Sequence, residues 1–212
     1  MNAKRTVADF PLPNLFEYFP SCSFVDKSNM PPIDPSAYGP AVAALLDGVP
    51  PAQLDAGASN EKFRPALAAL TPESLFAPSG RPVRDLPMAQ CCLEGLWLRH
   101  NFFDESHVLS QEIDTPTGSF WHAILHRREP DYGNARYWFR RVGPHPIYPP
   151  LNEAALAAGW PSQVRWDPLL FQGRVEQALQ SGPKSSEAQL CRTVQHLEWK
   201  LLFDYSWQQA TR

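Results

Sequence analysis

The sequence predicts an all-α fold, because apolar side chains recur at helical spacing and no stretch alternates cleanly between apolar and polar residues as a strand does. The 212 residues, 43% of them hydrophobic, are enough to form one domain with a substantial core. We therefore expect a single domain over residues 1–212, with a proline-rich wrap at 1–40, a core of helical hairpins at 86–146 and a long helix at 185–207.

Residues 1–40 predict an extended wrap. They contain seven of the 23 prolines, and proline interrupts helices because it lacks a backbone donor. The same segment carries Phe and Tyr side chains, which favour burial, so we expect it to pack in an ordered way around the body. Short helices are predicted at 41–46 and 63–70, and another begins after Thr71, a good N-cap residue that is followed by Pro72.

Four helices in tandem hairpins are predicted between residues 86 and 146. Links of only a few residues separate them, and Gly143 followed by Pro144 ends the last one. Asp104 is expected to cap the second of these helices. The predicted ranges are 87–100, 104–113, 119–129 and 131–142.

Three more helices are predicted in the C-terminal third of the chain. The last opens with Ser186 and Gln189 at capping-box spacing. It carries two apolar strips, one through Leu197 and the other through Trp199. Such a helix is either central in the fold or the seam of a homodimer. The predicted ranges are 152–158, 167–179 and 186–207.

Residues 130–142 resemble the second helix of a tetratricopeptide or Sel1-like repeat. In those repeats small and apolar residues fill the packing seam, and this chain has Ala135, Phe139 and Val142 in these places. Ser106, the counterpart of Ala135, lies 29 residues upstream, which is short of the roughly 34 residues of the standard repeat. The resemblance implies two degenerate helical hairpins and not a regular solenoid.

Residues 121–146 also resemble the core of an uncharacterised family of bacterial and fungal proteins of about this length. The stretch that carries the resemblance reads WHAILHRREPDYGNARYWFRRVGPHP. This second resemblance implies no activity.

Charge and composition exclude several classes of protein. The 19 basic and 22 acidic residues give a net charge of -3, which argues against nucleic acid as a partner. No apolar run has the length of a signal peptide core or a membrane span, so we expect a cytoplasmic protein without membrane contact. The cysteines form no C-x-x-C pair and are expected to be buried or half-buried free thiols. They are Cys22, Cys91, Cys92 and Cys191.

His122 and His126 are the strongest candidates for a metal site. They lie at i and i+4 on a predicted helix, and Glu129 follows at i+7, so the three side chains line one ridge and could hold a divalent metal ion. Ala123 stands where H-E-x-x-H metalloproteases have their general base, which argues against that class. The alternative is a pair of histidines at the surface or in hydrogen bonds. A third ligand could come from Asp131, His145 or His107.

The same region is the most basic part of the chain. Guanidinium groups form paired hydrogen bonds with carboxylates and phosphates, so we expect a site for a small anionic molecule or an acidic peptide; the alternative is ordinary salt bridges at helix ends. Arg128 projects onto the apolar side of its helix, and we expect it to pair with Asp131, Glu129 or Asp104. The predicted ligand-binding residues are His122, His126, Arg127, Arg136, Tyr137, Arg140, Arg141 and His145.

Three functions therefore remain open. The first is a module that binds a small anion or an acidic partner at the ridge of histidines and arginines. The second is an enzyme in which His122, His126 and Glu129 act as metal ligands or as acid/base groups. The third is a scaffold that dimerises through its C-terminal helix. The sequence has no G-x-S-x-G, P-loop or dinucleotide motif, which argues against the corresponding enzyme classes.

Overall fold

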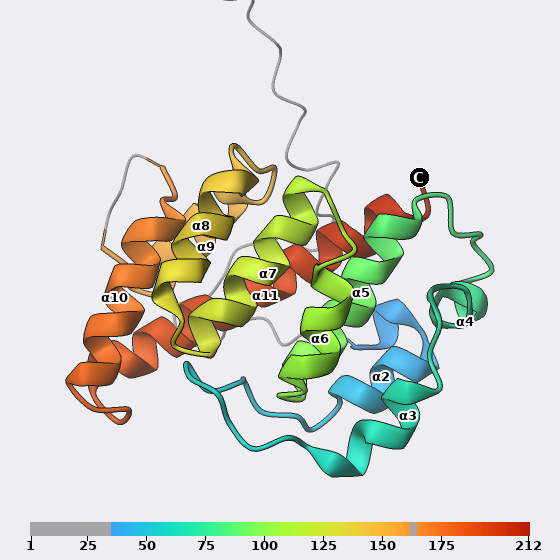
Figure 1. The fold of residues 1–212 in the computed structure, drawn as a ribbon, viewed down its shortest axis with the longest axis horizontal. Helices are drawn as coiled ribbons and strands as arrows, with labels where there is room; N and C mark the ends of the chain where they lie inside the picture. Colours follow the sequence, from blue (N-terminus) through green and yellow to red (C-terminus); the bar gives the residue numbers. More distant parts are fainter. Residues whose placement is uncertain (1–34, 162–164) are drawn as a thin grey trace, which may run out of the picture. The chain divides into compact units, whose positions relative to one another are not determined.

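The computed structural model describes residues 35–161 and 165–212, and these residues form helices and no strand, as predicted (Figure 1). The predicted wrap at 1–40 lies almost wholly outside the described residues. Short 3-10 turns cover Pro35–Tyr38, Glu61–Phe63 and Ala77–Ser79. The α-helices are α2 (Pro40–Leu46), α3 (Arg64–Ala68), α4 (Pro72–Phe76), α5 (Leu86–Arg99), α6 (Phe103–Ser110), α7 (Pro116–Arg128), α8 (Tyr132–Val142), α9 (Tyr148–Ala157), α10 (Pro168–Gln180) and α11 (Ser186–Ala210).

Side-chain caps explain where several helices begin. Thr71 accepts a hydrogen bond from the backbone of Ser74 at the start of α4, as expected, and Asp131 caps α8 through the backbone of Asn134. Two predicted caps are wrong. The oxygen of Ser185, one residue earlier than predicted, caps α11, and Asp104 lies inside the first turn of α6, where its charge complements the helix dipole.

The boundary between α6 and α7 also differs from the prediction. Helix α6 ends at Ser110, and α7 begins three residues before the predicted Ser119. Thr115 caps α7, and Pro116 at its first position costs no hydrogen bond. The chain packs tightly at this link, because a Cβ on Gly118 would lie 2.4 Å from the side chain of Ile113. A residue larger than glycine would therefore push the two helices apart.

Helix α11 is central in the fold. It packs against α5, α9 and α10 and runs behind α7 in Figure 1. Both of its apolar strips are buried within the chain, as Leu197 and Trp199 illustrate. This is the first of the two alternatives that its sequence left open, and a homodimer through α11 stays a prediction.

Within residues 86–146, α5 packs on α6 and α7 packs on α8. Ala135, Phe139 and Val142 of α8 are buried. The described residues all fall within one compact unit. Helix α7 therefore lies between α5, α6 and α8, and this position buries almost all of its side chains.

Two further expectations concern the described residues alone. Cys91, Cys92 and Cys191 are buried free thiols, as predicted, whereas Cys22 lies outside the described residues. Among the helices that the structure describes, none is both long and apolar enough to cross a membrane.

Candidate histidine site

Helix α7 places His122 and His126 on the same face, one turn apart. Their rings stack with centroids 4.7 Å apart and an interplanar angle of 24°. Both side chains are buried, with 2% and 4% of their surface exposed. The pair is therefore not a flat exposed ridge, and its environment must satisfy or bind the ring nitrogens.

His107 from α6 completes a group of three imidazoles, which we call the histidine triad. Its ring centroid lies 4.9 Å from that of His122 and 5.3 Å from that of His126. One nitrogen of each ring lies within 4.8 Å of the others. Of the three candidates for a third ligand, the fold brings His107 to the pair, whereas Asp131 caps α8 and His145 hydrogen-bonds to Thr117.

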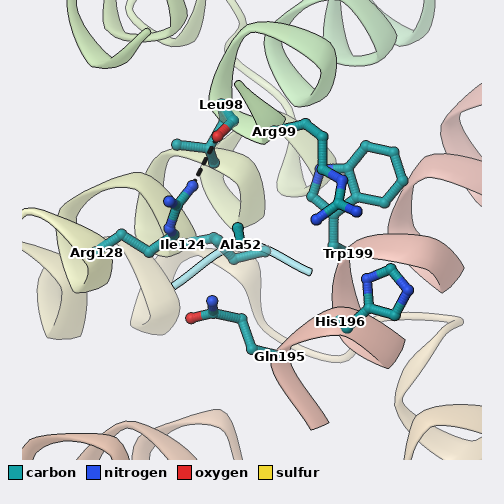
Figure 2. Close-up of a pocket in the computed structure, with 8 residues that line it drawn as sticks. All are labelled: Ala52, Leu98, Arg99, Ile124, Arg128, Gln195, His196 and Trp199. Atoms are coloured by element: carbon teal, nitrogen blue, oxygen red, sulfur yellow. Dashed lines mark hydrogen bonds between the residues drawn. The ribbon is translucent and has the colours of Figure 1, made fainter. Parts of the chain in front are cut away.

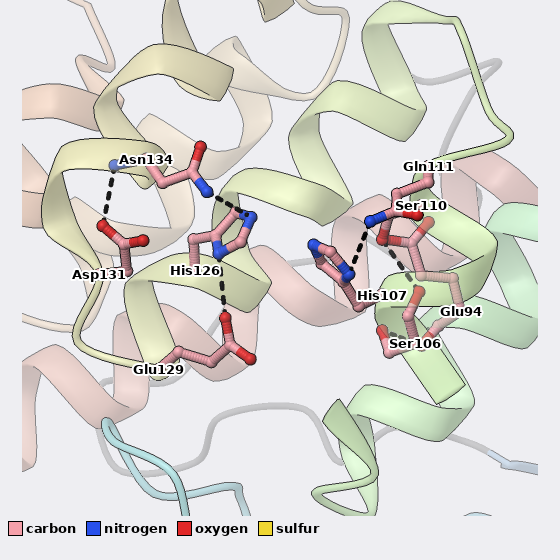
Figure 3. A network of polar contacts seen from close by, with 9 residues as sticks. All are labelled: Glu94, Ser106, His107, Ser110, Gln111, His126, Glu129, Asp131 and Asn134. Atoms are coloured by element: carbon pink, nitrogen blue, oxygen red, sulfur yellow. Dashed lines mark hydrogen bonds and ion pairs between the residues drawn. The ribbon is translucent and has the colours of Figure 1, made fainter. Parts of the chain in front are cut away.

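Polar side chains hydrogen-bond to nitrogens of two of these rings, those of His107 and His126 (Figure 3). The Nδ1 atom of His126 donates to the carboxylate of Glu129 at 2.9 Å, and the amide of Asn134 donates to its Nε2 atom at 3.0 Å. The amide of Gln111 donates to Nδ1 of His107 at 3.0 Å. Glu129 thus contacts the triad through the ring of His126 and is not itself a member of it.

His122 has no such contacts. Both of its ring nitrogens are buried and have no hydrogen-bond partner among the residues that the structure describes. One face of the ring stacks on Trp138 at a centroid distance of 4.0 Å. Burial, together with the charges that His126 and His107 would carry, lowers the pKa of His122 to about 3. Burial also lowers the pKa of His126, although Glu129 opposes this.

The triad fits a divalent transition-metal ion. Neutral imidazole is the form that binds metals, and zinc takes nitrogen ligands at about 2.0–2.1 Å. Nitrogens around a tetrahedral ion at that distance lie about 3.4 Å apart, so modest side-chain rotations would bring the three rings into position. The contact between His126 and Glu129 matches the carboxylate that commonly orients a metal-binding histidine.

The arginines that follow on α7 face the opposite way. Arg127 is fully buried and forms an ion pair with Glu198 of α11, with Nη2 and Oε2 2.5 Å apart. Arg128 is buried as well, but its predicted carboxylate partner is wrong. It donates to the backbone oxygens of Gln53 and Leu98 and to the side chain of Asn101. Oxygens from loops and from the last turn of α5, all distant in the sequence, therefore surround this charge.

The other predicted anion-binding residues do not gather at the histidines. Arg136 lies 3.7 Å from Glu176 and Arg141 lies 3.2 Å from Asp114, both on the surface. These contacts match the alternative of ordinary salt bridges. Tyr137 is 52% exposed. The structure therefore spreads the predicted ligand-binding residues over several surfaces.

Arg140 and His145 line an open cavity of about 660 Å³ beside α8 and α9. The same wall contains Arg165, but also Glu153 and Asp167, so it carries no excess of positive charge. This cavity is separate from the triad, which faces α6. The sequence indicated two of the three triad members, and its list of candidates for the third included His107. It gave no signal for Gln111.

Comparisons with protein-family models, with curated proteins and with solved structures returned no match. The tetratricopeptide-like character of the hairpins is therefore not confirmed, and the family resemblance of residues 121–146 stays an expectation. The function must be argued from the site itself.

Proposed function

We propose that this protein binds a divalent transition-metal ion through His107, His122 and His126. The observation that carries the proposal is the convergence of three imidazole nitrogens within 4.8 Å. Nitrogen ligands of this kind favour zinc and its neighbours over magnesium or calcium, which prefer oxygen. The predicted ligand set of His122, His126 and Glu129 is thereby revised, with His107 as the third ligand.

The unpartnered nitrogens of His122 support the same conclusion. Leaving a buried polar group without a hydrogen bond costs about 1–3 kcal/mol, and here both nitrogens of one ring are in that state. A metal ion would engage one of them. Glu129 would then hold the ring of His126 and raise its basicity, because it accepts the proton on Nδ1.

Three imidazoles leave a fourth position for water or an anionic ligand. The predicted small anion is therefore retained in our proposal as a group bound to the metal. An enzyme that uses His126 and Glu129 as an acid/base pair is the competing proposal, and their 2.9 Å contact favours it. Such an enzyme needs no metal, so metal content separates the two.

The first measurement is the metal content of untagged protein purified without chelator, by inductively coupled plasma mass spectrometry. We expect about one equivalent in the wild type and none in His122→Ala. Because His122 is deeply buried and its variant could fail to fold, the half-buried His107→Ala serves as a second variant with the same expected loss.

His145→Gln is the matched control. This histidine is also buried, but it contacts Thr117 and lies outside the triad, so the variant should keep its metal. Wild-type protein without stoichiometric metal, whose melting temperature does not respond to added Zn²⁺, Co²⁺ or Ni²⁺, would rule out the proposal. Metal that survives in His107→Ala would rule out this ligand set.

A further inference from the structure

A small cavity lies between α5, α7 and α11, on the side of α7 that faces away from the histidine triad (Figure 2). Its volume is about 10 Å³, which is close to the space that one water molecule needs. We call it the arginine cavity. Its walls are formed by Ala52, Leu98, Arg99, Ile124, Arg128, Gln195, His196 and Trp199.

The arginine cavity has two permanent positive charges in its wall. Arg99 is 5% exposed and Arg128 is 2% exposed. The oxygens that accept their hydrogen bonds within the described part of the chain are neutral, since Arg99 donates to the carbonyl of Val49 and Arg128 donates to carbonyl and amide oxygens. A buried charge is normally paired with an opposite one.

The buried carboxyl groups in the described part of the chain do not supply that pairing. They are Glu94 and Glu198. Glu198 is bound to Arg127. Glu94 contacts Ser110, and burial raises its pKa well above the usual range, so it favours the neutral form. Asp55 is half-buried, and of the groups that shift the pKa of Arg128 it has the smallest effect.

Two hydrogen-bonding atoms in the wall residues are buried without a partner. They are Nε of Arg99 and Nδ1 of His196. The Nε atom is always a donor, and Nδ1 of a neutral imidazole is a donor in one of its two tautomers. The guanidinium of Arg99 also lies 5.6 Å from the centre of the Trp199 ring, which gives the cavity a flat apolar side.

We infer that the arginine cavity binds one monatomic anion, chloride under physiological conditions, between Arg99, Arg128 and His196. An anion would offset the unpaired positive charge and accept from the two unpartnered nitrogens. The volume admits a single spherical ion and excludes phosphate, sulfate or a carboxylate. A water molecule would fit the space but would leave the charge uncompensated, and it is the alternative that the test must separate.

The test compares chloride with gluconate at constant ionic strength. Protein dialysed into gluconate is titrated with chloride, and its melting temperature is followed. At a chloride concentration ten times the dissociation constant, the melting temperature should have risen by roughly 3–6 °C, and above that concentration it should rise with the logarithm of the chloride concentration. Crystals grown with bromide should show one anomalous peak between Arg99 and His196. Equal melting temperatures in both salts, with no bromide peak, would mean that the cavity holds water.

His196→Phe keeps the bulk of the side chain and removes the donor, so it should lose the chloride effect. Arg136→Gln removes an exposed arginine of α8. It should keep the stabilisation by chloride and thus controls for screening of surface charge. His122→Ala should keep it as well, which separates this site from chloride bound to a metal at the triad. A chloride response that survives in His196→Phe would overturn the assignment.

Discussion

The two sides of α7 bury polar groups in opposite ways. Toward α6 and α8 it presents His122 and His126, whose rings favour the neutral state and whose nitrogens converge with that of His107. Toward α5 and α11 it presents Arg127 and Arg128, which are permanently charged and already hydrogen-bonded. Neutral imidazoles can exchange a hydrogen bond for a metal, whereas a buried guanidinium must keep its partners, so only the histidine side is suited to reversible binding of a cation.

The largest expected effect lies on the arginine side, at the ion pair between Arg127 and Glu198. Both side chains are fully buried, so Arg127→Met leaves an uncompensated carboxylate and should cost about 3–5 kcal/mol of unfolding free energy. Urea denaturation followed by tryptophan fluorescence measures this loss. The double variant Arg127→Met with Glu198→Leu should recover most of it, because neither charge then remains buried.

Arg136→Met is the matched control for that experiment. Its partner Glu176 lies 3.7 Å away on the surface, and exposed pairs contribute less than about 1 kcal/mol. If Arg127→Met costs no more than Arg136→Met, the contrast between buried and exposed arginines is wrong.

On the histidine side, Glu129→Gln tests how the carboxylate acts. If the carboxylate orients His126, Glu129→Gln should weaken metal binding by about 10- to 100-fold. The stability of the metal-free protein should stay nearly unchanged. Titration with Zn²⁺ in competition with a chelator measures the affinity. Complete loss of binding would instead make Glu129 a direct ligand, as the sequence first indicated.

Glycine substitutions test how closely the helices around α7 approach one another. A Cβ on Gly95 of α5 would lie 2.8 Å from the buried ring of Trp121 on α7, so Gly95→Ala should cost about 1–3 kcal/mol through overpacking. Gly173 is an exposed residue within α10 and has open space around it. Gly173→Ala should therefore stabilise the protein by about 0.5–1 kcal/mol through helix propensity. Thermal unfolding of both variants should show a lower melting temperature for Gly95→Ala and a higher one for Gly173→Ala.

Most helices were predictable because their signals are local. Apolar spacing, proline and the cap at Thr71 act within one or two turns, and the structure bears out that cap. The pairing of His122 with His126 was predictable for the same reason, since a helix places i and i+4 on one face. The sequence alone could not single out His107, because its position beside the pair depends on how α6 packs on α7. It therefore remained one of three candidates for the third ligand.

The arginines show where sequence reasoning ends. Arg128 was correctly expected to be buried, but its partner Gln53 lies 75 residues away in a loop, and no local pattern indicates such a contact. Arg127 was assigned to the ligand-binding ridge, although Glu198, 71 residues further on, binds it in the core. Contacts between residues far apart in the sequence depend on the tertiary fold. Two arginines that are neighbours in the sequence therefore have different partners, a carboxylate for Arg127 and neutral oxygens for Arg128.

The smallest expected effect compares two buried carboxyl groups, Glu94 of α5 and Glu198 of α11. Glu198 has Arg127 as a partner, whereas the Glu94 side chain accepts a hydrogen bond from Ser110 and its second oxygen has no partner among the described residues. Burial raises the pKa of Glu94 well above its ordinary value of 4.5. The folded state therefore holds this proton over a pH range in which the unfolded state has released it, and stability falls as the pH rises through that range. Glu94→Gln removes the titration.

The melting temperature of Glu94→Gln should match that of the wild type near the ordinary carboxyl pKa and exceed it increasingly as the pH rises above that value. Thermal unfolding across this range measures the difference. Glu198→Gln should show the contrary behaviour, because it leaves the buried charge of Arg127 without its carboxylate and destabilises the protein at neutral pH. A constant offset between Glu94→Gln and the wild type at every pH would mean that Glu94 is already ionised in the folded protein.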